Sequence, residues 1–297
     1  MAPIVFVLIA VAAVLHVTWN VLLKTAGEPL RAATVGMIAG AIVLIPGAFI
    51  GWSLIGRPAI APQAFALGLV SGVLEAIYFV FPSAAYRRGD LSVVYPIARG
   101  SATFLAVIVG VVVLGERLGP LGVIGVSCLL GGFLWLQRPW RALGLGQGPG
   151  AFDPAVAFAL ATGVTIAGYS AVDRVGTRQT EPWIYAAILW TTTAAVLIAW
   201  AVVKRSGSAA LEPLTQRGAV RASIGGLMTV GAYLCILVAF TLAPLTAVAP
   251  LRESAIVLAS GWGALRLGEA EGRREAIARI AAAALIVLGA VLLGLEG

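Results

Sequence analysis

Five ionisable side chains lie inside long apolar stretches of this sequence. They are His16, Glu75, Arg99, Arg252 and Glu253. A charged side chain in hydrocarbon costs several kcal/mol, about 3 kcal/mol on insertion scales, so such residues mark functional sites where the stretches around them cross a membrane. A buried carboxylate can hold an ammonium group or a proton, and a guanidinium can hold a carboxylate.

Glu75 has the most informative neighbours. Tyr78 and Pro82 follow it at spacings that place all three residues on one face of a helix. Two interpretations are open. Glu75 either lines a central cavity and meets a substrate, or it is protonated and hydrogen-bonded to a neighbouring helix as a packing contact.

Arg99 and Arg252 each lie about two turns into a predicted helix, and Tyr95 shares the helix face of Arg99. Each guanidinium either receives a substrate carboxylate or has a structural role. In the structural alternative Arg252 pairs with Glu253, while Arg99 caps carbonyl groups or extends to the interface.

Two more candidates, Trp19 and Asn20, share one face of the first predicted helix with His16, at positions i+3 and i+4 from it. Tyr169 and Tyr233 also lie deep in predicted helices, where their hydroxyl groups need partners. We expect all five residues to line the same cavity. For His16 the alternatives are a satisfied hydrogen-bonding side chain and a proton relay.

Catalytic chemistry has little support in the sequence. The chain has one histidine, two cysteines and no HExxH, GxSxG or Gly-Lys-Ser/Thr sequence. We therefore expect no catalytic residue, no metal site and no cofactor. An intramembrane enzyme and a non-transporting scaffold are the alternatives from other functional classes.

The amino-acid composition predicts the kind of secondary structure that positions these residues. Of 297 residues, 60% are hydrophobic and 11% are charged, against about 25% charged in soluble domains. Apolar runs of about 20 residues recur, which is the length of a membrane-spanning helix, and they lack the alternation of barrel strands. The net charge of +7 comes from loop residues without a continuous basic stripe. These features predict a polytopic helical membrane protein that binds no nucleic acid.

The sequence predicts ten spans, and a glycine-rich segment at 137–153 divides them into two groups of five. The predicted organisation is a first repeat at 1–140, a linker at 141–153 and a second repeat at 154–297. The spans cover residues 3–23, 32–52, 64–86, 91–114, 119–137, 154–174, 182–203, 222–242, 245–265 and 276–295.

The two halves match at an ungapped offset of 153 residues. The aligned pairs are Arg99 with Arg252, Ser101 with Ser254, Glu116 with Glu269, His16 with Tyr169, and Asn20 with Asp173. Duplication of an odd number of spans inserts the second copy in the opposite direction, as in many secondary transporters. The predicted fold is all-α, with ten transmembrane helices in two inverted five-helix repeats around a central cavity.

Small residues and loop charges add two expectations. The last span of each repeat has a small-residue face for close helix packing, formed by Gly122, Gly125 and Gly132 and by Ala278, Ala282 and Gly289. Glu116 and Glu269 end helices, where a structural cap or a gate is expected.

The loop cations orient the bundle. The basic residues on the poorer side are Arg57, Arg117, Arg174 and Arg178. Because the richer side faces the cytoplasm, both termini are predicted to be extracytoplasmic.

"YPIARGSATFLAVIVGVVVLGERL" resembles the end of the first repeat in EamA-type transporters of the drug/metabolite transporter superfamily, and "VAPLRESAIVLASGWGALRLGE" resembles its second copy. "HVTWNVLLK" is similar to the first helix of that family. The resemblance implies a ten-helix carrier in the bacterial inner membrane, nearest in function to amino-acid exporters of the YddG type. Many relatives are drawn with cytoplasmic termini, opposite to the orientation that the charges predict here.

We therefore expect export of small amphipathic metabolites by alternating access, above all amino acids including aromatic ones. Proton-coupled efflux of hydrophobic organic cations is the alternative. The expected partners are a small-molecule substrate and the lipid bilayer, with the protein acting as a monomer or a homodimer.

Overall fold

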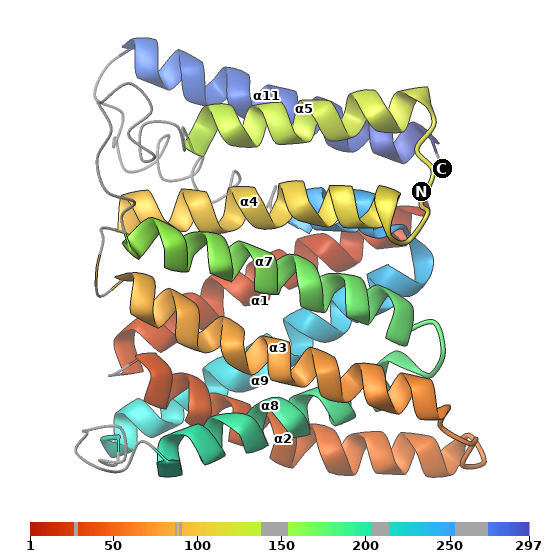
Figure 1. The fold of residues 1–297 in the computed structure, drawn as a ribbon, viewed down its shortest axis with the longest axis vertical. Coiled ribbons are helices and arrows are strands. Elements are labelled where there is room, and N and C mark those ends of the chain that lie inside the picture. The colour runs from red at the N-terminus through yellow and green to blue at the C-terminus, as the bar shows by residue number, and fades with distance from the viewer. Residues whose placement is uncertain are drawn as a thin grey trace.

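The computed structural model describes residues 1–26, 29–86, 88, 91–137, 154–203, 214–252 and 273–296. Within this part every regular element is a helix, and the helices lie side by side with similar axis directions (Figure 1). Their bounds are α1 (Pro3–Ala26), α2 (Pro29–Leu54), α3 (Pro62–Tyr86), α4 (Leu91–Val112), α5 (Pro120–Gln137), α7 (Pro154–Gly176), α8 (Pro182–Val203), α9 (Gln216–Leu242) and α11 (Arg273–Glu296). A further helical segment, here called the 245–252 helix, follows α9.

Proline begins most of these helices, because its fixed φ suits the first turn and its missing N–H leaves no donor unsatisfied there. The six helices that begin in this way start at Pro3, Pro29, Pro62, Pro120, Pro154 and Pro182. The N-cap of α9 is Thr215, whose hydroxyl accepts a hydrogen bond from the Gly218 amide at 3.1 Å. The predicted spans agree with these helices to within two turns, and the second half of the predicted span 245–265 lies outside the described residues.

Length and surface character show a membrane-embedded protein. Five helical stretches are long and apolar enough to cross a bilayer: Leu30–Leu54, Pro62–Pro82, Pro154–Gly176, Pro182–Val203 and Gln216–Leu242. The helices with shorter apolar segments also expose large apolar side chains, as Val14 does on α1, Val123 on α5 and Val291 on α11. Such faces suit lipid tails rather than water.

The most extensive helix contacts join the two halves of the chain. α1 packs along α9, α3 packs along α7 and α8, α4 packs along α7, and α2 packs along α8 and α9. α5 and α11 form a pair at one end of the long axis, and both chain termini lie at the same edge of the helical layer (Figure 1). The apolar core is therefore shared between the halves.

Glycines set the separation of several of these helix pairs. A Cβ on Gly36 of α2 would lie 2.9 Å from the Ala222 carbonyl oxygen of α9, and a Cβ on Gly226 would lie 2.0 Å from the Gly36 carbonyl oxygen. Between α5 and α11, a Cβ on Gly125 would lie 2.9 Å from the Gly289 carbonyl oxygen. The predicted small-residue contact between the last helices of the two halves is confirmed.

The substitution Gly36→Leu should lower thermal stability, because the backbone of α9 cannot move aside for the new side chain. Overpacking of this kind costs about 1–3 kcal/mol. The matched control is Gly47→Leu on the same helix, since a Cβ at Gly47 meets nothing within 4 Å. The measurement is the midpoint of thermal unfolding in detergent, and equal midpoints for the two variants would contradict the contact.

Candidate functional site

Seven rings form a series of neighbouring contacts through the protein, here called the aromatic chain. Its members in order are His16, Trp19, Phe79, Tyr78, Tyr169, Tyr233 and Trp190. Neighbouring ring centroids lie between 5.3 and 6.4 Å apart, a separation typical of favourable aromatic pairs. α1 and α3 supply the first four rings, and α7, α9 and α8 supply the others, so the aromatic chain passes from one half of the protein to the other.

Glu75 lies on α3 beside this series and is 6% exposed. The hydroxyl of Thr193 on α8 lies 3.5 Å from Glu75 Oε2 and 3.1 Å from the Gly72 carbonyl oxygen. The two helices approach this closely because residue 72 is glycine: a Cβ there would lie 2.6 Å from the Leu189 carbonyl oxygen. Glu75 is therefore an interior residue in contact with the second half of the chain.

The predicted arginines lie beside other predicted site residues. Arg99 on α4 is 9% exposed, and its Nη2 lies 3.4 Å from His16 Nε2 on α1. A guanidinium only donates hydrogen bonds, so this contact assigns Nε2 as the acceptor and places the proton of a neutral His16 on Nδ1. Arg252, in the 245–252 helix, interacts electrostatically with His16, Glu75 and Asp173.

Asp173 belongs to this group, although its position near a helix end kept it out of the predicted site. It lies in the last turn of α7, and it is 0% exposed. Tyr185 of α8 donates a hydrogen bond to Oδ1 at 2.9 Å, and Tyr233 of α9 donates one to Oδ2. Gly176, one turn further on, leaves room for the Tyr185 ring, since a Cβ there would lie 2.1 Å from Cε2.

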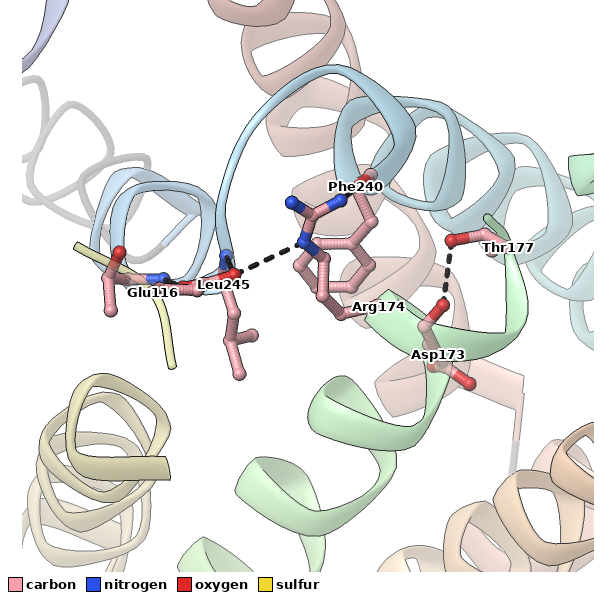
Figure 2. A network of polar contacts seen from close by, with 7 residues as sticks. Glu116, Asp173, Arg174, Thr177, Phe240 and Leu245 are labelled. Carbon is pink, nitrogen blue, oxygen red and sulfur yellow. Dashed lines mark hydrogen bonds and ion pairs between the residues drawn. The ribbon is translucent and has the colours of Figure 1, made fainter. Parts of the chain in front are cut away.

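Arg174, the residue next to Asp173, belongs to a second network (Figure 2). This Glu116 network consists of Glu116, Arg174, Phe240, Leu245 and Thr246. Glu116 Oε1 accepts hydrogen bonds from Arg174 Nε at 3.2 Å and from the Leu245 amide at 2.7 Å, and Oε2 accepts one from the Thr246 amide at 2.9 Å. Arg174 Nη1 also donates to the Phe240 carbonyl oxygen. The carboxylate thus caps the start of the 245–252 helix and ties the α4–α5 connection to α7 and α9.

Two glycines explain the position of the Gly115-Glu116 sequence just after α4. Gly115 has a φ of +65°, in the left-handed region that glycine tolerates, and the Glu116 amide donates to the Gly110 carbonyl oxygen at 2.9 Å. A Cβ on Gly110 would lie 2.7 Å from Glu116 Oε2. The predicted structural cap at Glu116 is confirmed, whereas Glu269 lies outside the described residues.

The predicted site residues fall into two sets. Those that the structure places together in and beside the aromatic chain are His16, Trp19, Glu75, Tyr78, Arg99, Tyr169, Tyr233 and Arg252. Asn20 and Tyr95 lie on α1 and α4, but their side chains are outside the described part of the structure, and so is all of Glu253.

Sequence reasoning missed Asp173, Tyr185, Trp190 and Thr193. Asp173 had a signal, because it aligns with Asn20 at the repeat offset. The other three carry no distinguishing sequence signal, because their contacts depend on how α8 packs against α2, α3 and α9. In the described ranges, no three His, Cys, Asp or Glu side chains gather as a metal site would require.

Comparison with known proteins shows the fold alone. No family model matches this chain, and no curated protein matches it. Among solved structures 29 chains match. One crystal structure superposes with a TM-score of 0.73 at 19% sequence identity, covering 99% of this chain and 99% of that chain. The same helix arrangement, over nearly the whole length of this chain, therefore occurs in a protein whose structure was determined by crystallography.

The substitution Glu116→Gln should destabilise the protein, because an amide cannot offer both of its heteroatoms as acceptors to Arg174 and the helix amides. The loss of charge-assisted hydrogen bonds predicts a cost of about 2 kcal/mol. Glu181→Gln is the control, because Glu181 is an exposed residue of the α7–α8 connection. Unfolding midpoints in detergent report the difference, and a midpoint for Glu116→Gln equal to that of Glu181→Gln would exclude a structural role for the cap.

Proposed function

We propose that this protein is a secondary transporter of the EamA type that exports small amphipathic metabolites by alternating access. One observation carries the proposal: Glu75, Asp173, Arg99 and His16 are brought together with a series of aromatic rings inside a membrane-embedded helical protein. Ionisable residues at membrane depth are expensive, and they mark substrate and ion pathways.

The proposed architecture is two inverted five-helix repeats. The pattern of helix contacts supports it, because the most extensive contacts among α1, α2, α3, α5, α7, α8, α9 and α11 are kept when the first four helices are exchanged with the last four. Under this exchange the α1–α9 pair becomes α7–α3, and the α2–α9 pair becomes α8–α3, while α2–α8 and α5–α11 map onto themselves. In secondary transporters with such a twofold relation, the transport site lies between the repeats, and we propose the same location here.

Amino acids, including aromatic ones, are the substrates that the side chains suit best. An ammonium group would meet Glu75, and a carboxylate would meet Arg99 or Arg252, whose planar donors match its geometry. The rings of Tyr78 and Tyr169 would accept an apolar side chain. The protein would act in a bacterial inner membrane with both termini extracytoplasmic, as the loop charges favour.

Efflux of hydrophobic organic cations is the second candidate. It is favoured by the electrostatic interaction of two buried carboxyl groups, Glu75 and Asp173, close to the aromatic chain. Carboxylates and ring faces together bind cations that carry no acidic group.

The test is counterflow in proteoliposomes with three probes: L-phenylalanine, L-threonine and tetraphenylphosphonium. Wild-type protein should exchange labelled L-phenylalanine. Glu75→Gln should slow this exchange by about ten- to a hundredfold, because a charged hydrogen bond contributes about 1.5–3 kcal/mol. Glu181→Gln, on the exposed loop, should leave it unchanged.

Two results would contradict parts of the proposal. Exchange of tetraphenylphosphonium alone, abolished by Glu75→Gln, would replace amino-acid export with cation efflux. Absence of flux for every probe with correctly folded wild-type protein would remove the transporter interpretation.

A further inference from the structure

Asp173 differs from the other buried ionisable groups in its hydrogen bonds. Both of its carboxyl oxygens meet phenol hydroxyls, Tyr185 at Oδ1 and Tyr233 at Oδ2. An ionised carboxylate accepts from both hydroxyls. A protonated carboxyl donates to one phenol oxygen and still accepts from the other phenol, because a tyrosine hydroxyl can serve in either role. The site therefore accommodates the residue with or without a proton, and no side chain has to leave.

The charged and titratable groups that face Asp173 come from three neighbouring helices. α3 presents Glu75, and α8 and α9 present Tyr185 and Tyr233. α4 also packs along α7, and its charged residue Arg99 contacts His16 on α1. The 245–252 helix presents Arg252, which interacts electrostatically with both Asp173 and Glu75. Together, Glu75, Asp173 and Arg252 carry no net charge when one of the two carboxyl groups is protonated.

The same turn of α7 also holds the Glu116 network. Asp173 and Arg174 are consecutive, and the Thr177 hydroxyl donates to the Asp173 carbonyl oxygen at 2.7 Å (Figure 2). Arg174 connects through Glu116 to the start of the 245–252 helix. Asp173 therefore shares a helix turn with Arg174, the residue that ties the α4–α5 connection to the second half.

The first half of the chain lacks an equivalent group. At the repeat offset Asp173 aligns with Asn20, and Arg174 aligns with Val21, so neither position of the first half can titrate. A titratable group that is present in only one of the two repeats acts at only one end of the bundle. An asymmetric site of this kind suits a cycle in which a single proton moves in one direction.

From these observations we infer that Asp173 is the proton-binding residue that couples substrate export to proton entry. The inference rests on the proposed transport function. The carboxylate takes up one proton from the end of the bundle where Glu116 lies and becomes a neutral acid, with no other bond made or broken. It releases that proton on the opposite side, and substrate moves outward in the half-cycle in which Asp173 is ionised.

The first experiment maps protonated carboxyl groups in the wild-type protein. Dicyclohexylcarbodiimide reacts with protonated carboxyl groups in apolar surroundings, and mass spectrometry locates the adduct. We expect modification of Asp173 that falls at least tenfold between acid and alkaline pH. Modification confined to Glu75, or unchanged with pH at Asp173, would overturn the inference without requiring any variant to fold.

The second experiment measures proton-driven accumulation of L-phenylalanine in proteoliposomes whose membrane potential is clamped with valinomycin and potassium. One pH unit across the membrane supports up to about tenfold accumulation for one-proton exchange. Asp173→Asn should reduce the accumulation ratio to one, whatever its exchange rate, and Asp173→Glu should restore accumulation. Glu181→Gln should behave as wild type.

The outcomes separate the two proposals. If wild-type protein exchanges none of the three probes, transport is excluded, while the carbodiimide mapping still decides whether Asp173 binds a proton. If exchange occurs and Asp173→Asn accumulates L-phenylalanine as well as wild type, transport stands and the role of Asp173 is wrong.

Discussion

Hydrocarbon offers no hydrogen bonds, so a polar group buried in a lipid-embedded bundle has to be satisfied by the protein itself. This constraint explains the close helix contacts of the structure. Thr193 reaches Glu75 only because Gly72 lets α3 and α8 approach, and Tyr185 reaches Asp173 only because Gly176 leaves space for its ring. Other buried hydroxyl groups donate to the backbone of their own helix, as Thr229 does to the Gly225 carbonyl oxygen.

The Glu116 network follows the same rule at a helix end. The 245–252 helix begins with amides that no preceding turn can satisfy, and a carboxylate from the other half of the chain supplies the acceptors. The positive φ of Gly115 and the absent side chain of Gly110 make this position of the carboxylate feasible. One ion pair, with Arg174, then holds the carboxylate in place.

Much of the helix layout could be predicted from the sequence, because apolar runs of membrane length and prolines at their starts are local signals. Glu75, Arg99 and His16 were equally accessible to prediction, since an ionisable residue in such a run is conspicuous. Asp173 had a weaker signal, its alignment with Asn20 at the repeat offset, because it lies one turn from a helix end and looks like a solvated residue until α8 and α9 cover it. Tyr185 and Thr193 depend in the same way on which helices become neighbours, and local sequence does not encode that choice.

The shared core also constrains how the chain is made. Ribosomes deliver α1 to α5 first, yet the main partners of α1 and α3 are α9 and α7, which emerge much later. During that interval Glu75 has no Thr193 beside it, and no second-half helix covers the small-residue faces of α2 and α5. The first five helices therefore enter the membrane as an unfinished assembly, and their stable packing begins only when synthesis of the second half brings in the complementary surfaces.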